Sequence, residues 1–219
     1  MLDSLWPLVR AGLVFTIPLA LLSFAFGLAL GFATAVARLF APAPIAAVAR
    51  FYVWFIRGTP LLVQLFVIFY GLPSVGILID AFPAALIGFS LSVGAYTSEI
   101  IRAALSSIPK GQWEAAFSIG MTRRQAMART IVPQAVRVAL PPLGNSFISL
   151  VKDTSLAAAI TVPELFQQAQ RVVAVTYEPL VLYIEAALLY LVFSSVLSAL
   201  QARLERRFAT YGGYLEGRP

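Results

Sequence analysis

Residues 11–37 read AGLVFTIPLALLSFAFGLALGFATAVA, a run without a single charged side chain. A membrane-spanning helix needs about 20 predominantly apolar residues, and this run exceeds that length. It is also longer than the apolar core of a signal peptide, which has about 7–15 residues, and no convincing cleavage region follows it. We therefore expect the segment to remain in the chain as a membrane anchor.

The same pattern recurs throughout the chain of 219 residues, of which 60% are hydrophobic and only 12% are charged. A soluble domain of this size cannot bury so much apolar surface, so part of its solvent must be lipid. Because charged residues separate long uncharged runs, we expect an all-α membrane protein with a single transmembrane domain over residues 1–219. Its five predicted spans lie at about 11–36, 56–79, 83–104, 137–160 and 180–201.

Basic residues fall almost entirely on one side of this five-span arrangement. Of the 16 lysines and arginines, only Arg10, Arg171 and Lys152 lie elsewhere. By the positive-inside rule, the amino terminus then faces outward and the carboxyl terminus lies in the cytoplasm. The net charge of +6 is not evidence for nucleic-acid binding, because the positive charges lie where the membrane topology would place them. The basic residues of the predicted cytoplasmic side are Arg38, Arg50, Arg57, Arg102, Lys110, Arg123, Arg124, Arg129, Arg137, Arg203, Arg206, Arg207 and Arg218.

Several kinds of chemistry are excluded by the residue types that the chain lacks. Cysteine is absent, which removes disulfide and thiol chemistry, and histidine is absent, which removes the commonest general base and metal ligand. Ser149 and Lys152 have a spacing that a peptidase could use, but such an enzyme also needs an oxyanion site. No Gly-x-x-x-x-Gly-Lys-Ser/Thr motif is present for binding ATP. The sequence therefore predicts no catalytic site, metal site or cofactor in this chain.

Residues 114–133, within the predicted loop at 109–133, form a polar, basic island in the otherwise apolar chain. Pro109 suits the first turn of a short helix, and Glu114 places a negative charge in the opening turns, where the helix dipole favours it. The spacing i, i+3, i+4, i+7 predicts one apolar face on this helix. That face consists of Trp113, Ala116, Phe117 and Gly120.

A turn and a second helix are expected after the first one. Gly120 can adopt the left-handed conformation that caps a helix, and Thr122 with Gln125 has the spacing of a capping box. The sequence thus predicts a helix, a turn and a helix on the cytoplasmic side. On the residues alone, the unit could also be an amphipathic helix on anionic headgroups, since Trp113 and the arginines suit that position.

Two ionisable residues lie deep in the fourth predicted span. Lys152 and Asp153 are about 22 Å from its cytoplasmic start, at a rise of about 1.5 Å per residue. Charges at such depth cost about 2.5–3.5 kcal/mol each on insertion scales, so they suggest a function. Asp153 could hold the ammonium group and Lys152 the carboxylate of a zwitterionic amino acid. The alternative is an internal ion-pair network.

Other polar and small residues indicate contacts between side chains, between helices or with a substrate. Glu99 and Arg102 in the third span are three residues apart and can pair on one helix face, near the cytoplasmic boundary. Gln64 in the second span could form an interhelical hydrogen bond or contact a substrate. Gly27 and Gly31 in the first span predict a close helix contact, either within the chain or between two copies.

Three stretches carry a family resemblance. Residues 57–66 read RGTPLLVQLF, residues 111–122 read GQWEAAFSIGMT, and residues 146–170 read SFISLVKDTSLAAAITVPELFQQAQ. Together with the Glu-Ala-Ala loop at 114–133, they resemble ABC-importer permeases of the polar amino acid family, bacterial L-cystine permeases above all. The resemblance covers most of residues 10–207. At 130–133 the chain reads TIVP where the family has Ile-x-Leu-Pro, a difference in helix packing rather than in chemistry.

The resemblance implies a transporter subunit, not an enzyme, with the type I importer permease fold of five transmembrane helices and a short cytoplasmic coupling helix. A separate ABC ATPase, carrying ATP and Mg²⁺, would dock on residues 112–124 of the coupling loop at 109–133. An extracytoplasmic binding protein would deliver the substrate, and a second copy or a paralogue would complete the machine in the bacterial inner membrane. L-cystine is the expected substrate, with glutamine, histidine and arginine as alternatives. A membrane scaffold or a passive channel is the remaining class, although no polar filter motif is evident.

The resemblance also assigns individual positions to two sites. The predicted ATPase-coupling residues are Gln112, Trp113, Glu114, Ala115, Ala116, Phe117, Gly120, Thr122 and Arg123. The predicted substrate-binding residues are Gln64, Thr97, Glu99, Lys152, Asp153, Thr154 and Ser155.

Overall fold

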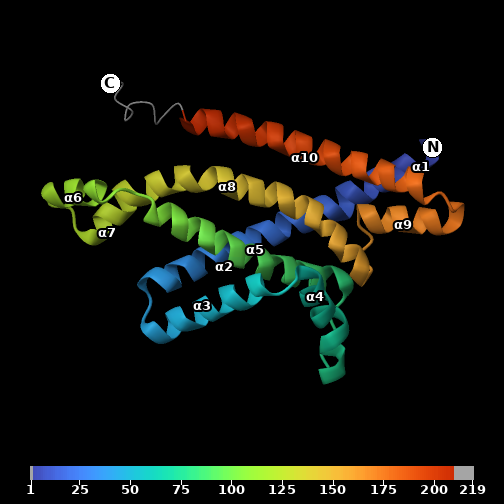
Figure 1. Ribbon diagram of the computed structural model, residues 1–219, viewed down its shortest axis with the longest axis horizontal. Helices are drawn as coiled ribbons and strands as arrows, with labels where there is room; N and C mark the ends of the chain where they lie inside the picture. The colour runs from blue at the N-terminus through green and yellow to red at the C-terminus, as the bar shows by residue number, and fades with distance from the viewer. Residues whose placement is uncertain (1, 210–219) are drawn as a thin grey trace.

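The first helical segment is a long rod that begins near the amino terminus. The computed structural model describes residues 2–209, and the side chains of residues 5–206. The rod consists of α1 (Leu2–Ala11), a π-helical turn η1 (Gly12–Thr16) and α2 (Ile17–Phe40). The rod ends at Ala41, which has an extended backbone, because the ring of Pro42 disfavours helical geometry in the residue before it. Figure 1 shows the rod running from the amino-terminal end along much of the length of the molecule.

The segment after α2 is helical rather than a linker. The residues between the first and second predicted spans contain Pro42 and Pro44, but α3 (Ala43–Gly58) occupies most of this segment. Pro44 sits in the first helical turn, where its missing amide proton is not needed. The helix folds back along α2, with which it makes direct contact. Figure 1 shows this reversal at the left of the molecule.

A sharp bend separates α3 from the next helical segment. α4 (Leu61–Phe66), the π-helical turn η2 (Val67–Gly71) and the 3-10 helix η3 (Leu72–Val75) follow one another, and their common axis is bent by 104° from α3. Thr59 and Pro60 are both extended at the bend. The second span predicted at 56–79 therefore begins before the bend and runs across it.

The centre of the fold is the pairing of α2 with α5 (Ala81–Ser106). Two glycines of α2 let these helices approach closely: a Cβ on Gly31 would lie 2.0 Å from Thr97 Oγ1, and one on Gly27 would lie 2.5 Å from a Val93 methyl carbon. The glycine pair therefore serves packing within the chain. The surrounding core includes Leu19, Leu65, Phe89, Val151 and Ile160.

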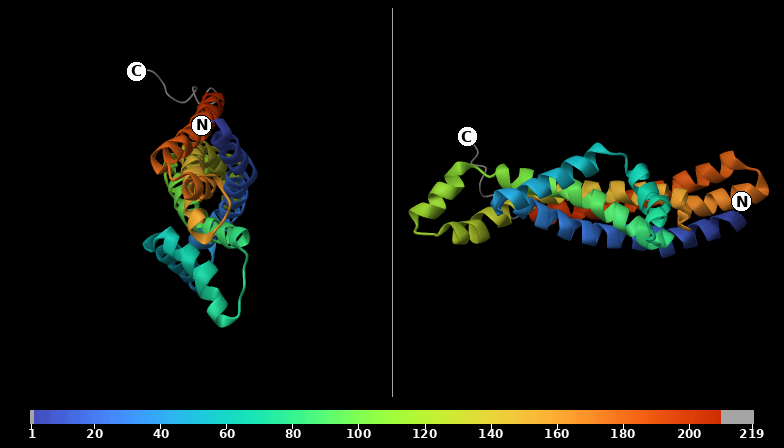
Figure 2. Two further views of the ribbon diagram at one scale, coloured as in Figure 1. Left: turned by 90° about the vertical axis from the view of Figure 1, so that its right-hand side faces the viewer. Right: turned by 90° about the horizontal axis from the view of Figure 1, so that it is seen from below.

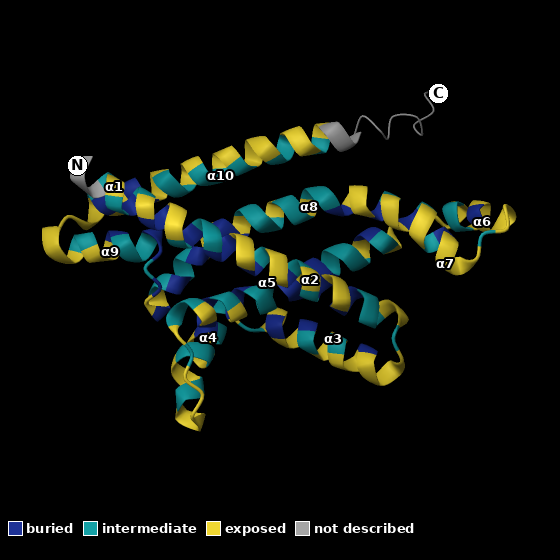
Figure 3. Ribbon diagram, turned by 180° about the vertical axis from the view of Figure 1, so that it is seen from behind, coloured by how far each residue is buried: buried dark blue, intermediate teal, exposed yellow. Residues whose placement is uncertain are grey.

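The second half of the chain adds three more long elements. α8 (Val132–Asp153) packs on α5 and continues as the 3-10 helix η5 (Thr154–Ile160). α9 (Leu165–Thr176) and α10 (Pro179–Ala209) follow, and they contact each other. Figure 3 shows that buried residues gather along the inner helices, whereas exposed residues run along α10.

The described helices fit a membrane protein. Leu5–Phe40, Ala81–Ser106 and Pro179–Arg206 are each long and apolar enough to cross a membrane, and the bent pair α3–α4 is a fourth candidate. α8 is not among these candidates, and it contains Pro141 and Pro142. Residues 2–209 contain helices and no strand, which agrees with the predicted all-α class. The number of five spans remains a prediction.

The two ends of the molecule differ in the elements that form them. α6 (Lys110–Ser118) and α7 (Arg123–Ala126) project at one end of the long axis, whereas α9 and the start of α1 lie at the other (Figures 1 and 2). The π-helical turn η4 (Met127–Ile131) joins α7 to α8. The predicted cytoplasmic loop thus lies far from the predicted outer segment between α8 and α10.

Candidate functional site

The short helix predicted within 109–133 is α6, and it ends as the sequence indicates. Gly120 has φ +80°, the left-handed conformation expected of it. The amide of Gly120 donates to the carbonyl of Phe117 at 2.9 Å, and the amide of Met121 donates to that of Ala116 at 3.1 Å. These two bonds form a Schellman motif, which satisfies carbonyl groups left free at a helix end. Gly120 therefore fixes the direction in which the chain leaves α6.

A capping box then opens α7, as predicted. The amide of Gln125 donates to Thr122 Oγ1 at 3.3 Å, and the amide of Thr122 donates to Gln125 Oε1 at 2.9 Å. Each residue thereby satisfies a donor that the start of the helix would leave unpaired. A further bond ties α6 to the bundle, because Gln134 Nε2 donates to Gln112 Oε1 at 3.0 Å.

Only part of the predicted apolar face of α6 packs inward. Ala116 is buried, and Trp113 packs against a cluster formed by Ala104, Ile108, Ile131, Ala135 and Ala139. Phe117 and Gly120, the other two residues of the predicted apolar face, are exposed. Glu114, Ala115, Thr122 and Arg123 are also exposed, and Ile119 is 73% exposed. The helical hairpin formed by α6, the turn at Gly120 and α7 thus presents a mixed apolar and charged surface at its tip.

A cavity of about 560 Å³ lies beside α5 and α8, close to the end of α3. Two of the predicted substrate residues, Glu99 and Asp153, line it. Arg57 lines it as well, and its guanidinium carbon lies 5.2 Å from the centre of the Tyr96 ring. The complete lining consists of Arg57, Leu61, Ser92, Val93, Tyr96, Glu99, Ile100, Pro142, Asn145, Ser146, Ser149, Leu150, Asp153 and Leu156.

Glu99 is the centre of an arginine cluster. Its Oε2 accepts hydrogen bonds from Arg102 Nε at 3.0 Å and from Arg102 Nη2 at 2.7 Å, which is the predicted i, i+3 pair. Its Oε1 also accepts a hydrogen bond from Arg38 at the end of α2, and Arg57 Nη1 lies 3.9 Å from the same oxygen. The sequence did not predict that Arg38 and Arg57 lie beside Glu99, because the packing of α2 and α3 against α5 brings them to it. The one feature of the sequence that could have indicated this contact is that both arginines, like Glu99, lie near the cytoplasmic ends of predicted spans.

Gln64 lies at the helix bend rather than in the cavity. Its Nε2 donates to the carbonyl of Ile56 at 2.8 Å, to that of Thr59 at 3.2 Å and to Thr59 Oγ1 at 2.8 Å. These acceptors belong to the end of α3 and the break after it. The side chain thus stabilises the bend between α3 and α4.

The other predicted substrate residues are placed differently from one another. Thr97 is buried at the contact between α2 and α5 and donates to the carbonyl of Val93 at 2.8 Å. Thr154 is buried and donates to the carbonyl of Val151, whereas Ser155 donates to that of Lys152. Lys152 is exposed and is not part of the cavity lining. Within the described side chains, no ion pair joins Lys152 to Asp153.

A buried polar cluster that was not predicted from the sequence lies beside α9, at the end of the molecule opposite to α6 and α7 (Figure 1). Glu164 is fully buried, and its Oε1 accepts a bond from the amide of Gln167 at 2.7 Å, capping α9. Its Oε2 accepts bonds from Tyr190 on α10 at 2.6 Å and from Thr16 in η1 at 3.4 Å. Thr16 Oγ1 also accepts a bond from the amide of Leu165 at 3.2 Å. One carboxylate thus joins three segments far apart in the sequence.

Comparisons with known proteins agree with this architecture. Residues 25–210 match the family described as binding-protein-dependent transport system inner membrane components. The chain belongs to this family. This membership confirms the sequence-based interpretation of the chain as an importer permease, a multi-pass inner membrane component of a transport system and not an enzyme.

Individual permeases of this family resemble the chain over nearly its whole length. The L-cystine transport system permease protein TcyB of Bacillus subtilis is 53% identical, over 95% of this chain and 90% of its own length. The glutamine transport system permease protein GlnP of Escherichia coli K12 is 38% identical, over 94% of this chain and 96% of its own length. A crystal structure of an amino acid ABC transporter with histidines matches with a TM-score of 0.91 and 37% identity, over 94% and 96%.

Proposed function

We propose that the chain is the permease subunit of an ATP-driven amino acid importer and that its substrate is L-cystine. The cavity carries this proposal, because Arg57 from α3 and Asp153 from α8 bring opposite charges to its lining. Its volume of about 560 Å³ lies within the range of about 300–1,000 Å³ that is usual for small-molecule sites. The similarity to a cystine permease supports the choice among amino acids.

The charges of the cavity suit the two poles of an amino acid. Asp153 is an acceptor for an ammonium group, and the guanidinium of Arg57 can bind a carboxylate through two parallel hydrogen bonds. Arg57 therefore takes the part that the sequence suggested for Lys152, which does not line the cavity. Glu99 lies beside Arg57 and limits the positive charge there, since Arg57 Nη1 is 3.9 Å from Glu99 Oε1.

A second copy of the chain is proposed to close this cavity. Arg57, Tyr96, Asn145, Ser149 and Asp153 all line the cavity and are exposed in the single chain. Charged and polar groups at membrane depth are normally covered by protein or line a water-filled path. Pairing along this face would place two such cavities, or one shared path, between the copies. A paralogue of similar shape would cover the face in the same way.

The hairpin of α6 and α7 is proposed as the dock for the ATPase, with ATP and Mg²⁺ held by that partner. Its exposed tip offers Glu114, Phe117 and Ile119, and its turn is fixed by two backbone bonds at Gly120. A rigid projection of this kind can transmit movement of a partner to α5 and α8, which it joins. We place the hairpin in the cytoplasm, and α9 on the outer side, where a binding protein would deliver the substrate.

Uptake by the reconstituted transporter tests the proposal. The permease, its ATPase and its binding protein are assembled in vesicles, and uptake of radiolabelled cystine is measured against unlabelled glutamine, histidine and arginine. We expect ATP-dependent cystine uptake that a tenfold excess of the other amino acids does not abolish. Uptake of glutamine without cystine would overturn the substrate but not the class of machine. Uptake without ATP would overturn the ATP-driven mechanism.

A further inference from the structure

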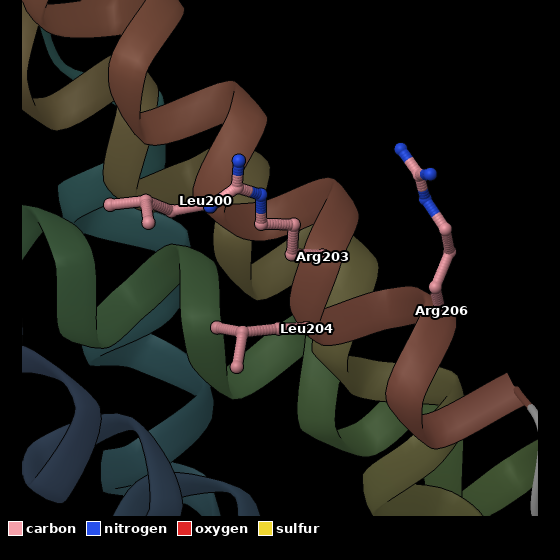
Figure 4. Close-up of a pocket in the computed structure, with 4 residues that line it drawn as sticks. All are labelled: Leu200, Arg203, Leu204 and Arg206. Atoms are coloured by element: carbon pink, nitrogen blue, oxygen red, sulfur yellow. The ribbon is translucent and has the colours of Figure 1, made fainter.

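The contact between α10 and α8 includes a polar side chain among apolar ones. Leu200, Gln201 and Leu204 of α10 line the space between this helix, α8 and α2. Figure 4 shows the two leucines pointing to the same side of α10, whereas Arg206 extends away from the helix. A polar side chain at such a contact needs hydrogen-bond partners, because its apolar surroundings offer none. The partners of Gln201 therefore define how α10 meets α8 at this point.

Gln201 finds its partners on α8 and on its own helix. Its Nε2 donates to the carbonyl of Pro141 at 3.1 Å, to Asn145 Oδ1 at 3.3 Å and to Glu205 Oε1 at 2.7 Å. Gly144 makes room for the side chain, since a Cβ there would lie 2.5 Å from Gln201 Cδ. Gln201 Oε1 has no hydrogen-bond partner within the described part of the chain. The contact thus uses the donor half of the Gln201 amide.

The chemistry of these acceptors fixes which way the two amides point. A carbonyl and a carboxylate accept hydrogen bonds and do not donate them, so the Gln201 atom between Pro141 and Glu205 must be the donor nitrogen. An Asn145 nitrogen beside it would set donor against donor, whereas the Asn145 oxygen accepts. The oxygen of Asn145 is therefore held by α10, and the two N–H groups on its Nδ2 remain for other partners.

Asn145 also belongs to the lining of the cavity that contains Arg57 and Asp153. It is exposed in the single chain, and its Nδ2 donates to no other group among the described residues. One amide group thus has its acceptor engaged on the side of α10, while its donors are available on a residue that lines the cavity.

We propose that Asn145 binds the substrate, donating hydrogen bonds from Nδ2 to the substrate carboxylate, and that Gln201 is a positioning residue that keeps these donors available to the cavity. The inference rests on the proposed function, in which the cavity holds the amino acid. Arg57 supplies positive charge for the carboxylate, and Asn145 adds neutral donors. An ammonium group only donates hydrogen bonds, so it gains nothing from Nδ2 and pairs with Asp153 instead.

Equilibrium binding of radiolabelled cystine to the purified permease–ATPase complex tests the inference. The binding protein is omitted, so that its own site does not contribute. We expect the dissociation constant to rise about tenfold in Asn145→Ala, which loses hydrogen bonds to a charged group, and about threefold in Gln201→Met. Gln201→Lys keeps a donor for the same acceptors and should bind like the unaltered complex. Gln170→Met changes an exposed glutamine on α9 and is the matched control.

The double variant Asn145→Ala with Gln201→Met separates positioning from a structural role. If Gln201 acts through the Asn145 amide, the double variant binds like Asn145→Ala alone, because no oriented donor is left to lose. A Gln201 that only holds α10 against α8 would weaken binding by the same factor in both backgrounds, and that result would overturn the inference. Gly144→Ala displaces the Gln201 amide without removing it, and it takes the place of Gln201→Met if that variant does not fold.

Asp153→Asn in the same assay distinguishes a failure of this inference from a failure of the proposed function. If Asp153→Asn weakens binding and Asn145→Ala does not, the cavity holds the substrate but the Asn145 amide does not contact it. If neither variant weakens binding, or if the unaltered complex shows no saturable binding, the cavity is not the substrate site and both proposals fail.

Discussion

The hydroxyl group of Tyr190 on α10 donates a hydrogen bond of 2.6 Å to Glu164, the residue that caps α9. Glu164 is fully buried, and its other oxygen accepts the amide of Gln167. The pair joins the last long helix to the segment that follows η5. The 3-10 helix η5 connects this segment to Asp153, the last residue of α8, which lines the cavity.

Tyr190→Phe is expected to destabilise the permease. Removal of one donor from a buried acceptor costs about 1–3 kcal/mol. For a chain of this size, each kcal/mol lowers the melting temperature by about 2–4 °C. Tyr183→Phe is the matched control, because Tyr183 on the same helix is exposed. Thermal unfolding of the two purified variants measures the difference, and equal melting temperatures would show that the Tyr190–Glu164 bond contributes nothing.

Gly120→Ala is expected to weaken ATPase binding while membrane insertion persists. No atom lies within 4 Å of the Cβ that alanine would add, so the cost arises from the positive φ alone and is about 1 kcal/mol. Gly120→Val should be more strongly impaired, because a β-branched side chain tolerates this conformation poorly. Gly111→Ala is the matched control, because it adds the same Cβ atom to open space at a position in α6 that has no positive φ.

Copurification of the ATPase with each glycine variant, together with transport, tests the role of the turn. The Gly111→Ala variant should recover the ATPase at the normal yield, and Gly120→Ala should recover less. If Gly120→Val also recovers a normal yield and transports normally, the hairpin of α6 and α7 is not the dock.

Local signals made much of this fold predictable from sequence. The turn at Gly120 and the capping box of Thr122 and Gln125 depend on residues within a few positions of one another. Glu99 and Arg102 likewise pair along one helix face. The helix class followed from long uncharged runs, because lipid leaves few structures that satisfy the backbone.

Contacts between distant segments were not predictable in this way. Arg38 reaches Glu99 from 61 residues away, and Thr16 reaches Glu164 from 148 residues away. Gly58 and Pro60 indicate a break in the backbone beside Arg57, but the sequence does not give the direction of the chain after it, which the structure shows as a bend of 104°. The pattern could not show that Lys152 lies outside the cavity, since the lining depends on how α5, α8 and the end of α3 meet.

Cysteine labelling is expected to show α7 in the cytoplasm and α9 outside. The chain has no native cysteine, so single cysteines at Gln125 and Gln168 can be labelled without background. Their helices lie at opposite ends of the molecule (Figure 1). A membrane-impermeant maleimide should label Gln168→Cys in intact cells or right-side-out vesicles and Gln125→Cys only in inverted vesicles. Labelling of both from the same side would contradict the five-span topology.

Asp153→Asn is expected to give a stable transporter that hydrolyses ATP but takes up little amino acid. Asp153 is exposed in the single chain, lines the cavity and forms no ion pair with Lys152 among the described side chains. Its neutralisation therefore removes an acceptor for the substrate ammonium group without leaving an unpaired buried partner. Asp80→Asn, an exposed acid outside the cavity, is the control and should leave uptake unchanged.

Melting temperature, basal ATPase rate and substrate-stimulated uptake together separate a substrate contact from a structural ion pair. Breaking a buried ion pair typically costs 3–5 kcal/mol, whereas removing both charges restores much of the stability. If Asp153→Asn unfolds, and Asp153→Asn combined with Lys152→Gln recovers both stability and uptake, the two residues form a structural pair in the assembled transporter. If only uptake is lost, and the double variant does not restore it, Asp153 contacts the substrate.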